Sequence, residues 1–374
     1  MSVYFDISAA VHRRAGLGRY AESLARGLLP LLGDELAFFY NREAGVEPLA
    51  GLEHVPARTV SLGYKPWRML VWLGQLGRIR FDRLLPGARL YHATEHLLMP
   101  LAGVPTVLTV HDLIFRRYPA HHKPLNRAYL NATLPLFCRR AGHIIAVSEQ
   151  TKRDIMAAYH VPAQKISVIH EAADPRFRPQ PPEAVAEARA RYGLPARYLL
   201  FVGTIEPRKN LGRVLAAFER LHRERLTDAL VIVGRRGWLY DAFFAQLEAS
   251  PARQAVLFPG FVPDADLPAV YAGSQAVAFP SEFEGFGLPV LEGMACGAPV
   301  VCSNTSSLPE VAGDAALLVD PLDTDALTDA LRRVLADPGL AAELRQRGYA
   351  QAARFSWSRA AQETAAVYER LLRP

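Results

Sequence analysis

The chain has 374 residues, of which half are hydrophobic and 21% are charged, so its length and composition favour two ordinary globular domains. This composition excludes a disordered or collagen-like chain. The net charge is +6, and residues 1–175 carry 21 Lys and Arg against 14 Asp and Glu, so the whole excess lies in the first half. That asymmetry indicates an anionic partner for the first half, with a solvated basic face as the alternative.

The three cysteines are odd in number and lack metal-ligand spacing, which argues against a disulfide framework or a zinc module and favours a reducing cytoplasm. No apolar run reaches the roughly 20 residues that span a bilayer. The first ten residues, MSVYFDISAA, lack a secretory signal pattern. We therefore expect a chain that is neither secreted nor membrane-spanning.

Short apolar runs alternate with amphipathic stretches in the first half of the chain. Strands are predicted at Val3–Ile7, Ala37–Tyr40, Thr106–Val110, His143–Val147 and Ile166–Ile169, with helices at Tyr20–Leu32, Pro124–Arg140 and Glu149–Ala158. This alternation predicts a parallel sheet with helices on both faces.

A proline-rich stretch, residues 174–182, then predicts an interdomain linker, followed by a helix Glu183–Tyr192 that Gly193 caps. Further strands are predicted at Tyr198–Val202, Ala229–Val233, Ala255–Phe258, Ala276–Phe279, Pro299–Val301 and Ala316–Val319. Helices are predicted at Leu211–Arg225, Trp238–Leu247, Leu267–Tyr271, Pro289–Ala295, Thr324–Leu335 and, last, Ser358–Leu372. The sequence therefore predicts two doubly wound, Rossmann-like α/β domains facing a cleft.

The first candidate motif, Gly16-Leu-Gly-Arg-Tyr-Ala21, matches the dinucleotide pattern G-x-G-x-x-A. Eight residues separate it from the preceding strand, and no acid follows a second strand about 20 residues later, so the dinucleotide interpretation is weak. Gly16 and Gly18 at a helix start still offer backbone N–H groups to a phosphate, with a plain turn as the alternative.

The second motif, Gly203-Thr-Ile-Glu-Pro-Arg-Lys-Asn210, directly follows a predicted buried strand. Arg208 offers a planar fork of donors and Lys209 a point charge, a pair suited to a diphosphate. The alternative is a solvated cation pair with Asn210 as N-cap, which is unfavourable because cations oppose the dipole of a helix N-terminus.

The third motif runs from Phe279 to Glu292 and contains Gly-Phe-Gly between a strand and a helix that Pro289 is predicted to open. The two glycines let the backbone approach a ligand closely. Glu284 precedes the loop and Glu292 is predicted in the first helical turn, so both carboxylates can bind sugar hydroxyls in one cleft. Favourable interaction with the helix dipole is the alternative for Glu292.

Together, Glu284-x7-Glu292 around Gly-Phe-Gly, Glu-Pro-Arg-Lys upstream and Gly-Leu-Gly near the N-terminus resemble a family-4-type retaining glycosyltransferase of GT-B fold, over essentially the whole chain. The resemblance implies that Arg208 and Lys209 hold the donor diphosphate and that Glu292 binds the ribose. It further implies that the backbone of Phe286–Leu288 meets phosphate and sugar, and that Glu284 contacts the transferred sugar.

The same resemblance implies that Gly16 and Gly18 close on the phosphate, that Gly260–Val262 lies against the base, and that His111 lies near the sugar. It assigns residues 1–175 to an acceptor-binding domain, to which the terminal helix within 358–374 returns. Residues 196–355 become the nucleotide-sugar-binding domain, and 176–195 the linker.

One departure concerns Thr204, which lies where many relatives have an arginine in the donor-binding loop. Either Arg208 replaces that charge or the diphosphate is bound more weakly than in those relatives.

Two further groups are candidate metal sites. His92, His96, His111, His121 and His122 crowd one region but lack flanking acids, so a loop and surface interpretation is favoured. Asp264-Ala-Asp266 and Asp323-Thr-Asp325 imitate a metal-binding D-x-D, yet both precede predicted helices and are expected to cap them. We expect no obligatory metal.

The sequence thus predicts a retaining hexosyltransferase that uses a nucleotide diphosphate sugar and a hydroxyl acceptor on a glycan or lipid-linked glycan. Leu308-Pro-Glu-Val resembles bacterial polysaccharide mannosyltransferases, which favours GDP-mannose over UDP-glucose or dTDP-rhamnose. A retaining glycosidase, a nucleotide-sugar epimerase and a non-catalytic sugar-nucleotide-binding subunit are the alternatives. The enzyme is expected in the cytoplasm, with the stretch Tyr64–Trp72 as a candidate contact with an anionic membrane through Lys65, Arg68, Trp67 and Trp72.

Overall fold

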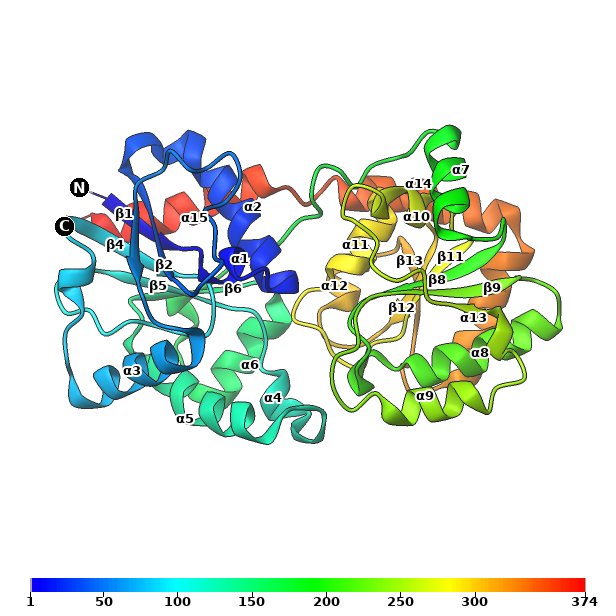
Figure 1. Cartoon of the computed structure of the whole chain (residues 1–374), viewed down its shortest axis with the longest axis horizontal. Coiled ribbons are helices and arrows are strands. Elements are labelled where there is room, and N and C mark those ends of the chain that lie inside the picture. Colours follow the sequence, from blue (N-terminus) through cyan, green and yellow to red (C-terminus); the bar gives the residue numbers. More distant parts are fainter. Residues whose placement is uncertain (1, 374) are drawn as a thin grey trace. The chain divides into compact units, whose positions relative to one another are not determined.

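The computed structural model describes residues 2–373 and divides them into two compact units (Figure 1). Unit 1 comprises the residues up to Glu171 together with those from Ser356 onward, and unit 2 comprises Ala172–Phe355. Each unit has its own sheet and its own core, and each is described separately below.

Unit 1 contains a seven-stranded parallel sheet with the order β3-β2-β1-β4-β5-β6-β7. The strands are β1 (Ser2–Asp6), β2 (Leu36–Asn41), β3 (Ala57–Val60), β4 (Ala88–Ala93), β5 (Thr106–Val110), β6 (His143–Ala146) and β7 (Ile166–Val168). The α-helices are α1 (Ser8–Val11), α2 (Ala15–Leu32), α3 (Tyr64–Gly77), α4 (Ile114–Arg117), α5 (Pro124–Arg140), α6 (Glu149–Tyr159) and α15 (Trp357–Leu372), with short 3-10 turns η1 (Gly33–Glu35), η2 (Asp82–Leu84), η3 (Pro119–His121) and η4 (Ala163–Lys165).

The predicted strands and helices of the first half are confirmed within a few residues, but β3, β4, α3 and the short helices α1 and α4 were not predicted. The edge strand β3 is mostly exposed, and its sequence Ala-Arg-Thr-Val carries no apolar run. The stretch Tyr64–Trp72, predicted as a membrane contact, begins α3. The prediction that Trp67 contacts a membrane is wrong, because its side chain is buried in the core against Phe39 and Phe81.

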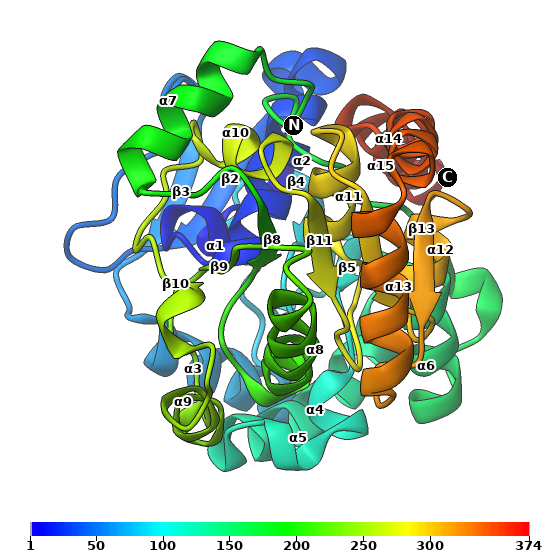
Figure 2. The ribbon, with the colours of Figure 1, turned by 90° about the vertical axis from the view of Figure 1, so that its right-hand side faces the viewer.

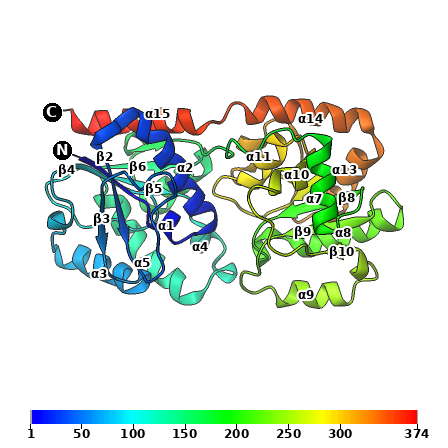
Figure 3. The same cartoon turned by 45° about the horizontal axis from the view of Figure 1, so that its top comes forward.

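The terminal helix α15 returns to unit 1, as predicted, and packs along α2 (Figure 3). The close approach depends on Gly27, where an added Cβ would lie 2.9 Å from the Cβ of Ala361. Tyr368 anchors the far end of the helix through a 2.6 Å hydrogen bond with Nδ1 of the buried His92.

Unit 2 contains a six-stranded parallel sheet with the order β10-β9-β8-β11-β12-β13. The strands are β8 (Tyr198–Val202), β9 (Ala229–Val233), β10 (Val256–Leu257), β11 (Ala276–Phe279), β12 (Val300–Ser303) and β13 (Ala316–Val319). The helices are α7 (Pro182–Tyr192), η5 (Pro207–Lys209), α8 (Leu211–Arg223), α9 (Asp241–Glu248), η6 (Arg253–Ala255), α10 (Leu267–Ala272), α11 (Leu288–Ala295), α12 (Leu308–Ala312), α13 (Thr324–Ala336) and α14 (Pro338–Ala352).

Helices cover both faces of this sheet, with α8, α9 and α13 on one face and α10, α11 and α14 on the other (Figure 2). The strands β8, β9 and β11 are buried throughout, which is why each reads as a continuous apolar run in the sequence. Helices α12 and α14 were not predicted.

The segment 176–195, predicted as the linker, lies within unit 2. Its helix α7 packs on α10, and Phe177 contacts the ring of Tyr271 edge-on. The predicted cap at Gly193 is confirmed, with φ of +63°.

All three cysteines are buried and free, so no disulfide forms among the described residues. Within residues 2–373, no helix has both the length and the hydropathy needed to cross a bilayer.

Candidate active site

In each sheet the chain changes winding direction between two neighbouring strands, and ligands of doubly wound folds bind outside the carboxyl ends of such strands. In unit 2 these are β8 and β11, which pair directly. The loop after β8 carries Arg208 and Lys209, and the loop after β11 carries Glu284. A backbone hydrogen bond of 2.9 Å from the Glu282 amide to the Arg208 carbonyl joins the two loops.

The Arg208 guanidinium is buried and bound to two carboxylates. Nη1 lies 2.7 Å from Oε1 of Glu284, and Nη2 donates to Oε1 of Glu206. Nη1 also donates to the carbonyl oxygen of Phe283. These contacts fix the orientation of the guanidinium, so the interpretation of Arg208 as a solvated surface cation is wrong.

Lys209 is buried beside Arg208, and its Nζ donates to Oε1 of Glu284 at 2.6 Å. The ammonium also lies 4.7 Å over the ring of Phe279. Burial lowers the pKa of Lys209 below its ordinary value, although the charge of Glu284 opposes that shift. Arg208 and Lys209 therefore have their negative partners within the protein, namely the carboxylates of Glu206 and Glu284.

Glu284 accepts from both cations. Burial alone would raise the pKa of its carboxyl, but the charges of Arg208 and Lys209 outweigh burial and hold that pKa below its usual value. Its backbone is also held, since its amide donates to Oγ of Ser306 at 2.9 Å and its carbonyl accepts from Oγ of Ser307 at 3.0 Å. Glu284 is thus an ionised carboxylate in a fixed position.

The Gly-Phe-Gly loop leads from Glu284 into α11. Gly287 has φ of +120°, a conformation that favours glycine, and a Cβ there would lie 2.6 Å from Cδ2 of Leu308. The ring of Phe286 packs edge-on against Phe355, so only its backbone is a candidate for ligand contact. The helix begins at Leu288, one residue earlier than predicted, which makes Pro289 its second residue.

Glu292 lies in the second turn of α11, whereas the sequence predicted the first turn. The helix-dipole explanation for Glu292 is therefore wrong. The carboxylate is buried, and Tyr271 donates its hydroxyl to Oε2 at 3.0 Å. This hydrogen bond from α10 positions the carboxylate independently of the Arg208 and Lys209 contacts.

Thr204 is half-buried, and its methyl lies 2.5 Å from the position that a Cβ on Gly237 would occupy. The segment following β9 runs beside it, because the Ile205 amide donates to the Arg235 carbonyl at 3.0 Å and Ile205 forms a parallel bridge with Arg236. Arg235 and Arg236 are therefore two exposed cations beside the position that lacks the family arginine. The sequence analysis missed both, although their place directly after β9 was a usable signal.

In the segment Gly260–Val262, the side chain of Val262 is buried, whereas the neighbouring Phe261 is 87% exposed. A nucleobase stacking on this segment would therefore meet Phe261, which the sequence analysis did not single out.

In unit 1, α2 begins at Ala15, so Gly16 and Gly18 lie inside its first turn and a half rather than before it. A Cβ on Gly18 would lie 2.9 Å from the Ala9 carbonyl oxygen, so Gly18 permits the close packing of α1 and α2. A Cβ on Gly16 would have no heavy atom within 4 Å. Of the two glycines, only Gly16 leaves its backbone open to a ligand.

His111 follows β5 and is buried between two acceptors. Its Nδ1 lies 3.2 Å from Oε1 of Glu171, and its Nε2 lies 2.9 Å from the carbonyl oxygen of Thr94. Burial alone would lower the pKa of His111, but the hydrogen bond and charge of Glu171 outweigh burial and raise it. The ring of Tyr20 contacts the imidazole edge-on at 4.7 Å.

The carboxyl ends of β1 and β4 in unit 1 carry a polar cluster that the sequence analysis missed. Arg14 pairs with Oε2 of the buried Glu95 at 2.8 Å and lies over the ring of Tyr64 at 3.3 Å. The buried Asp6 accepts from the Tyr91 hydroxyl at 2.8 Å. Burial and the charge of Glu95 raise the pKa of Asp6 to about 6.

Among residues 2–373 no cluster of His, Cys, Asp or Glu has the arrangement of a metal site. Asp323 caps α13 as predicted, accepting from the Ala326 amide at 2.9 Å. Asp266 lies at the N-cap position of α10, but its side chain does not cap the helix, because that carboxylate accepts from Arg191 at 2.7 Å and from Tyr192.

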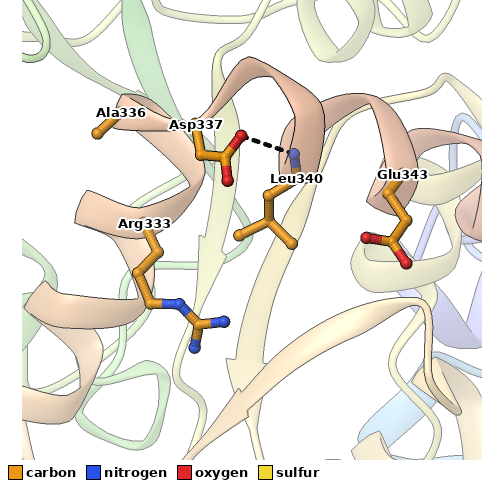
Figure 4. A pocket seen from close by; sticks show the side chains of 5 residues that line it. All are labelled: Arg333, Ala336, Asp337, Leu340 and Glu343. Atoms are coloured by element: carbon orange, nitrogen blue, oxygen red, sulfur yellow. Dashed lines mark hydrogen bonds between the residues drawn. The ribbon is translucent and has the colours of Figure 1, made fainter.

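Two hollows on the surface lie elsewhere. One, of about 410 Å³, lies where α13 meets α14, and there Asp337 accepts from the amide of Leu340 as a helix cap (Figure 4). The other, of about 610 Å³, includes Val3 and Arg89 at the amino ends of β1 and β4. Neither hollow is lined by a predicted site residue.

In comparisons with known proteins, each half of the chain matches a glycosyltransferase family model, and relatives match nearly its whole length. Residues 14–177 match the model described as Glycosyltransferase Family 4, and residues 186–351 match that described as Glycosyl transferases group 1. The chain is 32% identical to O-antigen chain mannosyltransferase B of Escherichia coli, covering 99% of this chain and 100% of that protein. It is 28% identical to the MMP alpha-(1->4)-mannosyltransferase of Mycolicibacterium hassiacum, covering 96% and 95%.

Solved structures share the fold. Sucrose-phosphate synthase from Thermosynechococcus elongatus superposes with a TM-score of 0.81 at 21% identity, covering 99% of each chain. WaaG, a glycosyltransferase involved in lipopolysaccharide biosynthesis, gives 0.74 at 16% identity, covering 98% of each. The chain is a glycosyltransferase and belongs to the family-4 type with the GT-B fold.

Proposed function

We propose that this enzyme transfers mannose from GDP-mannose to a hydroxyl of a glycan or lipid-linked glycan, with retention of anomeric configuration, in polysaccharide biosynthesis. The mannosyltransferases that share 32% and 28% identity over nearly the whole chain support mannose as the sugar. UDP-glucose and dTDP-rhamnose are the competing donors.

The observation that carries the proposal is the cluster of two buried cations and two carboxylates at the switch point of unit 2. Buried charges persist only when they are paired. A diphosphate oxygen can replace a carboxylate oxygen as acceptor for Arg208 and Lys209, so the cluster suits an anion that arrives and leaves. A retaining glycosidase needs only a pair of carboxylates, so glycosidase chemistry would give the two buried cations no role.

In the proposed reaction the diphosphate takes over part of the pairing that Glu284 holds in this structure. Arg208 and Lys209 then stabilise the charge that develops on the leaving diphosphate. Glu284, released from one cation, contacts the transferred sugar. These two side chains supply the positive charge that a divalent ion would otherwise bring, so we propose no obligatory metal.

The remaining donor contacts are proposed from position. Glu292 would bind the ribose and the backbone of Phe286, Gly287 and Leu288 the phosphate and sugar. The base would lie by Val262, and Thr204 would line the diphosphate.

In unit 1, the open backbone of Gly16 would face the phosphate, Gly18 would keep α2 close to α1, and His111 would act near the sugar.

Glu284→Gln tests this arrangement sharply, because the amide keeps the shape but removes the charge that competes for the two cations. Free GDP should bind more tightly to Glu284→Gln than to the parent enzyme, while transfer of mannose falls by at least ten-fold. Glu282→Gln, two residues earlier in the same loop and only partly buried, is the matched control and should change neither. Unchanged or weaker GDP binding in Glu284→Gln would contradict the exchange of Glu284 for diphosphate.

A thermal-shift panel of nucleotide sugars identifies the donor, because a bound donor stabilises the native state by mass action. Release of free nucleotide only when an acceptor is consumed distinguishes the transferase from an epimerase, which changes the sugar without an acceptor. Binding without turnover on any acceptor would favour a non-catalytic subunit.

We also propose that the enzyme works in the cytoplasm, peripherally on the inner face of the membrane, where a lipid-linked acceptor would be presented. The excess positive charge of residues 1–175 supports an anionic surface as the partner.

A further inference from the structure

Helix α3 exposes a row of large aliphatic side chains. Met69, Leu70, Leu73 and Leu76 are 42%, 41%, 54% and 58% exposed. They are spaced at i, i+1, i+4 and i+7, which places them on one face of the helix. Ile79, 57% exposed, follows the end of the helix. We call these five residues the α3 apolar face.

The opposite face of α3 is packed in unit 1, so the helix cannot rotate to hide the exposed row. Trp67 and Val71 are buried in the core. Arg68 donates to Asn126 of α5 at 3.0 Å and lies over the ring of Tyr129 at 3.9 Å. The apolar face is therefore a fixed feature of the folded unit.

The charge along residues 64–83 is almost entirely positive, although the exposed Glu43 lies at the start of α3, where its carboxylate accepts from the Tyr64 amide. Lys65, Arg78, Arg80 and Arg83 are exposed on the helix or just after it. The segment 64–83 contains a single acid, Asp82, whose carboxylate accepts from the amides of Ala102 and Gly103. A short amphipathic helix with aliphatic side chains and a basic border is complementary to an anionic lipid surface.

We propose that the α3 apolar face is the surface through which this enzyme binds an anionic membrane, with α3 lying in the plane of the headgroups. Leu73 and Leu76 enter the acyl boundary, and Lys65, Arg78, Arg80 and Arg83 contact lipid phosphates. This inference deepens the peripheral location in the proposed function but does not depend on the donor or the reaction. It replaces Trp67 and Arg68 with residues that the fold leaves exposed.

Co-sedimentation with vesicles of phosphatidylglycerol and phosphatidylcholine tests the proposal, with phosphatidylcholine vesicles as the neutral arm. The full-length enzyme should bind the anionic vesicles at low salt and be released by high salt. Arg78→Gln/Arg80→Gln should weaken binding about five-fold per charge. Leu73→Asn/Leu76→Asn should weaken it roughly ten-fold per side chain.

Leu239→Asn/Leu322→Asn is the matched control, since those leucines of unit 2 are 56% and 59% exposed. The control should bind vesicles as the parent enzyme does, and all variants should keep the parent unfolding temperature. Equal loss in the control, or no binding by the parent enzyme at low salt, would overturn the proposal. Self-association without vesicles that Leu73→Asn/Leu76→Asn abolishes would instead assign the face to a homodimer.

An independent observation concerns the protonation state of the His111 ring. Both ring nitrogens face oxygen acceptors, a carboxylate at 3.2 Å and a carbonyl at 2.9 Å. A carbonyl oxygen cannot donate, and an ionised carboxylate cannot either. A neutral imidazole has one N–H, so it could satisfy only one of the two.

We infer that Glu171 is a positioning residue that holds His111 as an imidazolium, with both N–H groups committed to Glu171 and to the Thr94 carbonyl. The ring then contributes a fixed positive charge and cannot accept a proton from the acceptor hydroxyl. This inference rests on the proposed function only for the role of that charge. The protonation state itself is measurable without turnover.

The other titratable groups facing His111 are Tyr20, His92, His96 and Asp112. Burial lowers the pKa of His92 to about 3 and that of His96 to about 4, so both stay neutral at pH 7. Nε2 of His96 accepts from the His111 amide at 3.1 Å, which also requires an unprotonated nitrogen there. The charge on His111 is therefore balanced by Glu171 and Asp112.

Long-range 1H–15N spectra of the full-length enzyme labelled in histidine measure this state, with His111→Gln assigning the signal. His111 should show two protonated ring nitrogens at pH 7.5. In Glu171→Gln the proton affinity of the His111 ring, read from the midpoint of its titration, should fall by at least ten-fold. Glu53→Gln, which changes an exposed acid of the same unit, should leave that midpoint unchanged. A neutral His111 ring in the parent enzyme would overturn the inference, and loss of activity in Glu171→Gln without a change in this midpoint would reduce Glu171 to a structural role.

Discussion

Because Arg208 and Lys209 share the carboxylate of Glu284, we expect removal of Glu284 to lower the stability of unit 2 more than removal of Lys209. Glu284→Leu leaves the buried Lys209 without its 2.6 Å acceptor, whereas Arg208 keeps Glu206. Breaking a buried pair in this way costs about 3–5 kcal/mol. Lys209→Met leaves Glu284 paired with Arg208 at 2.7 Å, so only one charged hydrogen bond is lost, about 1.5–3 kcal/mol. The double variant leaves no orphaned charge and should be more stable than Glu284→Leu.

Thermal unfolding followed by calorimetry measures these differences. At roughly 2–4 °C per kcal/mol for a unit of this size, Glu284→Leu should lower the unfolding temperature of unit 2 by about 6–20 °C and Lys209→Met by about 3–12 °C. Glu224→Leu, which breaks an exposed pair with Arg332, is the control and should cost at most about 1 kcal/mol. If the two single losses simply add in the double variant, the three side chains do not form the unit described here.

Three further predictions concern the chemical step, donor binding and helix packing. Lys209→Ala should lower turnover on the order of 100–1000-fold by removing charge from the departing diphosphate, and an activity within a few-fold of the parent would refute that role. Glu292→Ala should weaken free GDP and the donor alike, by roughly 0.5–3 kcal/mol in titration calorimetry, because the lost contact is to ribose; a loss confined to the donor would place Glu292 on the sugar instead. Gly18→Leu should destabilise unit 1 by about 1–3 kcal/mol because its Cβ meets the Ala9 carbonyl at 2.9 Å, whereas Gly16→Leu, with open space, should leave the unfolding temperature unchanged; equal effects would contradict the packing assigned to Gly18.

The elements that the sequence predicts best are those whose burial is uniform. Strands such as β8 and β9 are buried on both faces and therefore read as unbroken apolar runs. The loops after β8 and β11 were predicted as site loops because doubly wound sheets bind ligands at carboxyl strand ends. That topological rule applies to unit 1 as well, where it would have indicated Asp6 at the end of β1 but not Glu95, because β4 was not predicted.

The contacts within the candidate site were not predictable from local sequence, because they join residues far apart in the chain. Arg208 and Glu284 are 76 residues apart, and a pattern shows neither that they pair nor that Glu206 completes the cluster. The stretch Tyr64–Trp72 shows the same limit, because aromatic and basic residues alone cannot reveal which side of α3 faces the core. Trp67 is buried because it packs against Phe39 of β2 and Phe81, residues distant in the chain, whereas Leu73 is exposed.

Asp6 predicts a pH dependence of unit 1 with a definite sign. Its pKa is raised from 3.8 to about 6 by burial and by the charge of Glu95, so the folded unit holds this proton more tightly than the unfolded chain. The resulting stabilisation is complete below pH 3.8 and is lost as the pH rises through 6, a change of about 3 kcal/mol. In Asp6→Asn the amide oxygen can still accept from the Ser8 amide and the NH2 group can donate to the Tyr91 hydroxyl, so that variant keeps the fold but lacks the titration.

The informative quantity is the difference in unfolding temperature between Asp6→Asn and the parent enzyme, because the other titrating groups contribute equally to both. Between pH 4.5 and pH 7.5 this difference should change in favour of the variant, by roughly 2–4 °C for each kcal/mol of the Asp6 contribution. A lost hydrogen bond in the variant would shift the two curves by a constant amount and leave the slope unaffected. A difference that stays constant across this range would show that Asp6 is ionised at little cost, and the repulsion between Asp6 and Glu95 inferred from their burial at the ends of β1 and β4 would then be wrong.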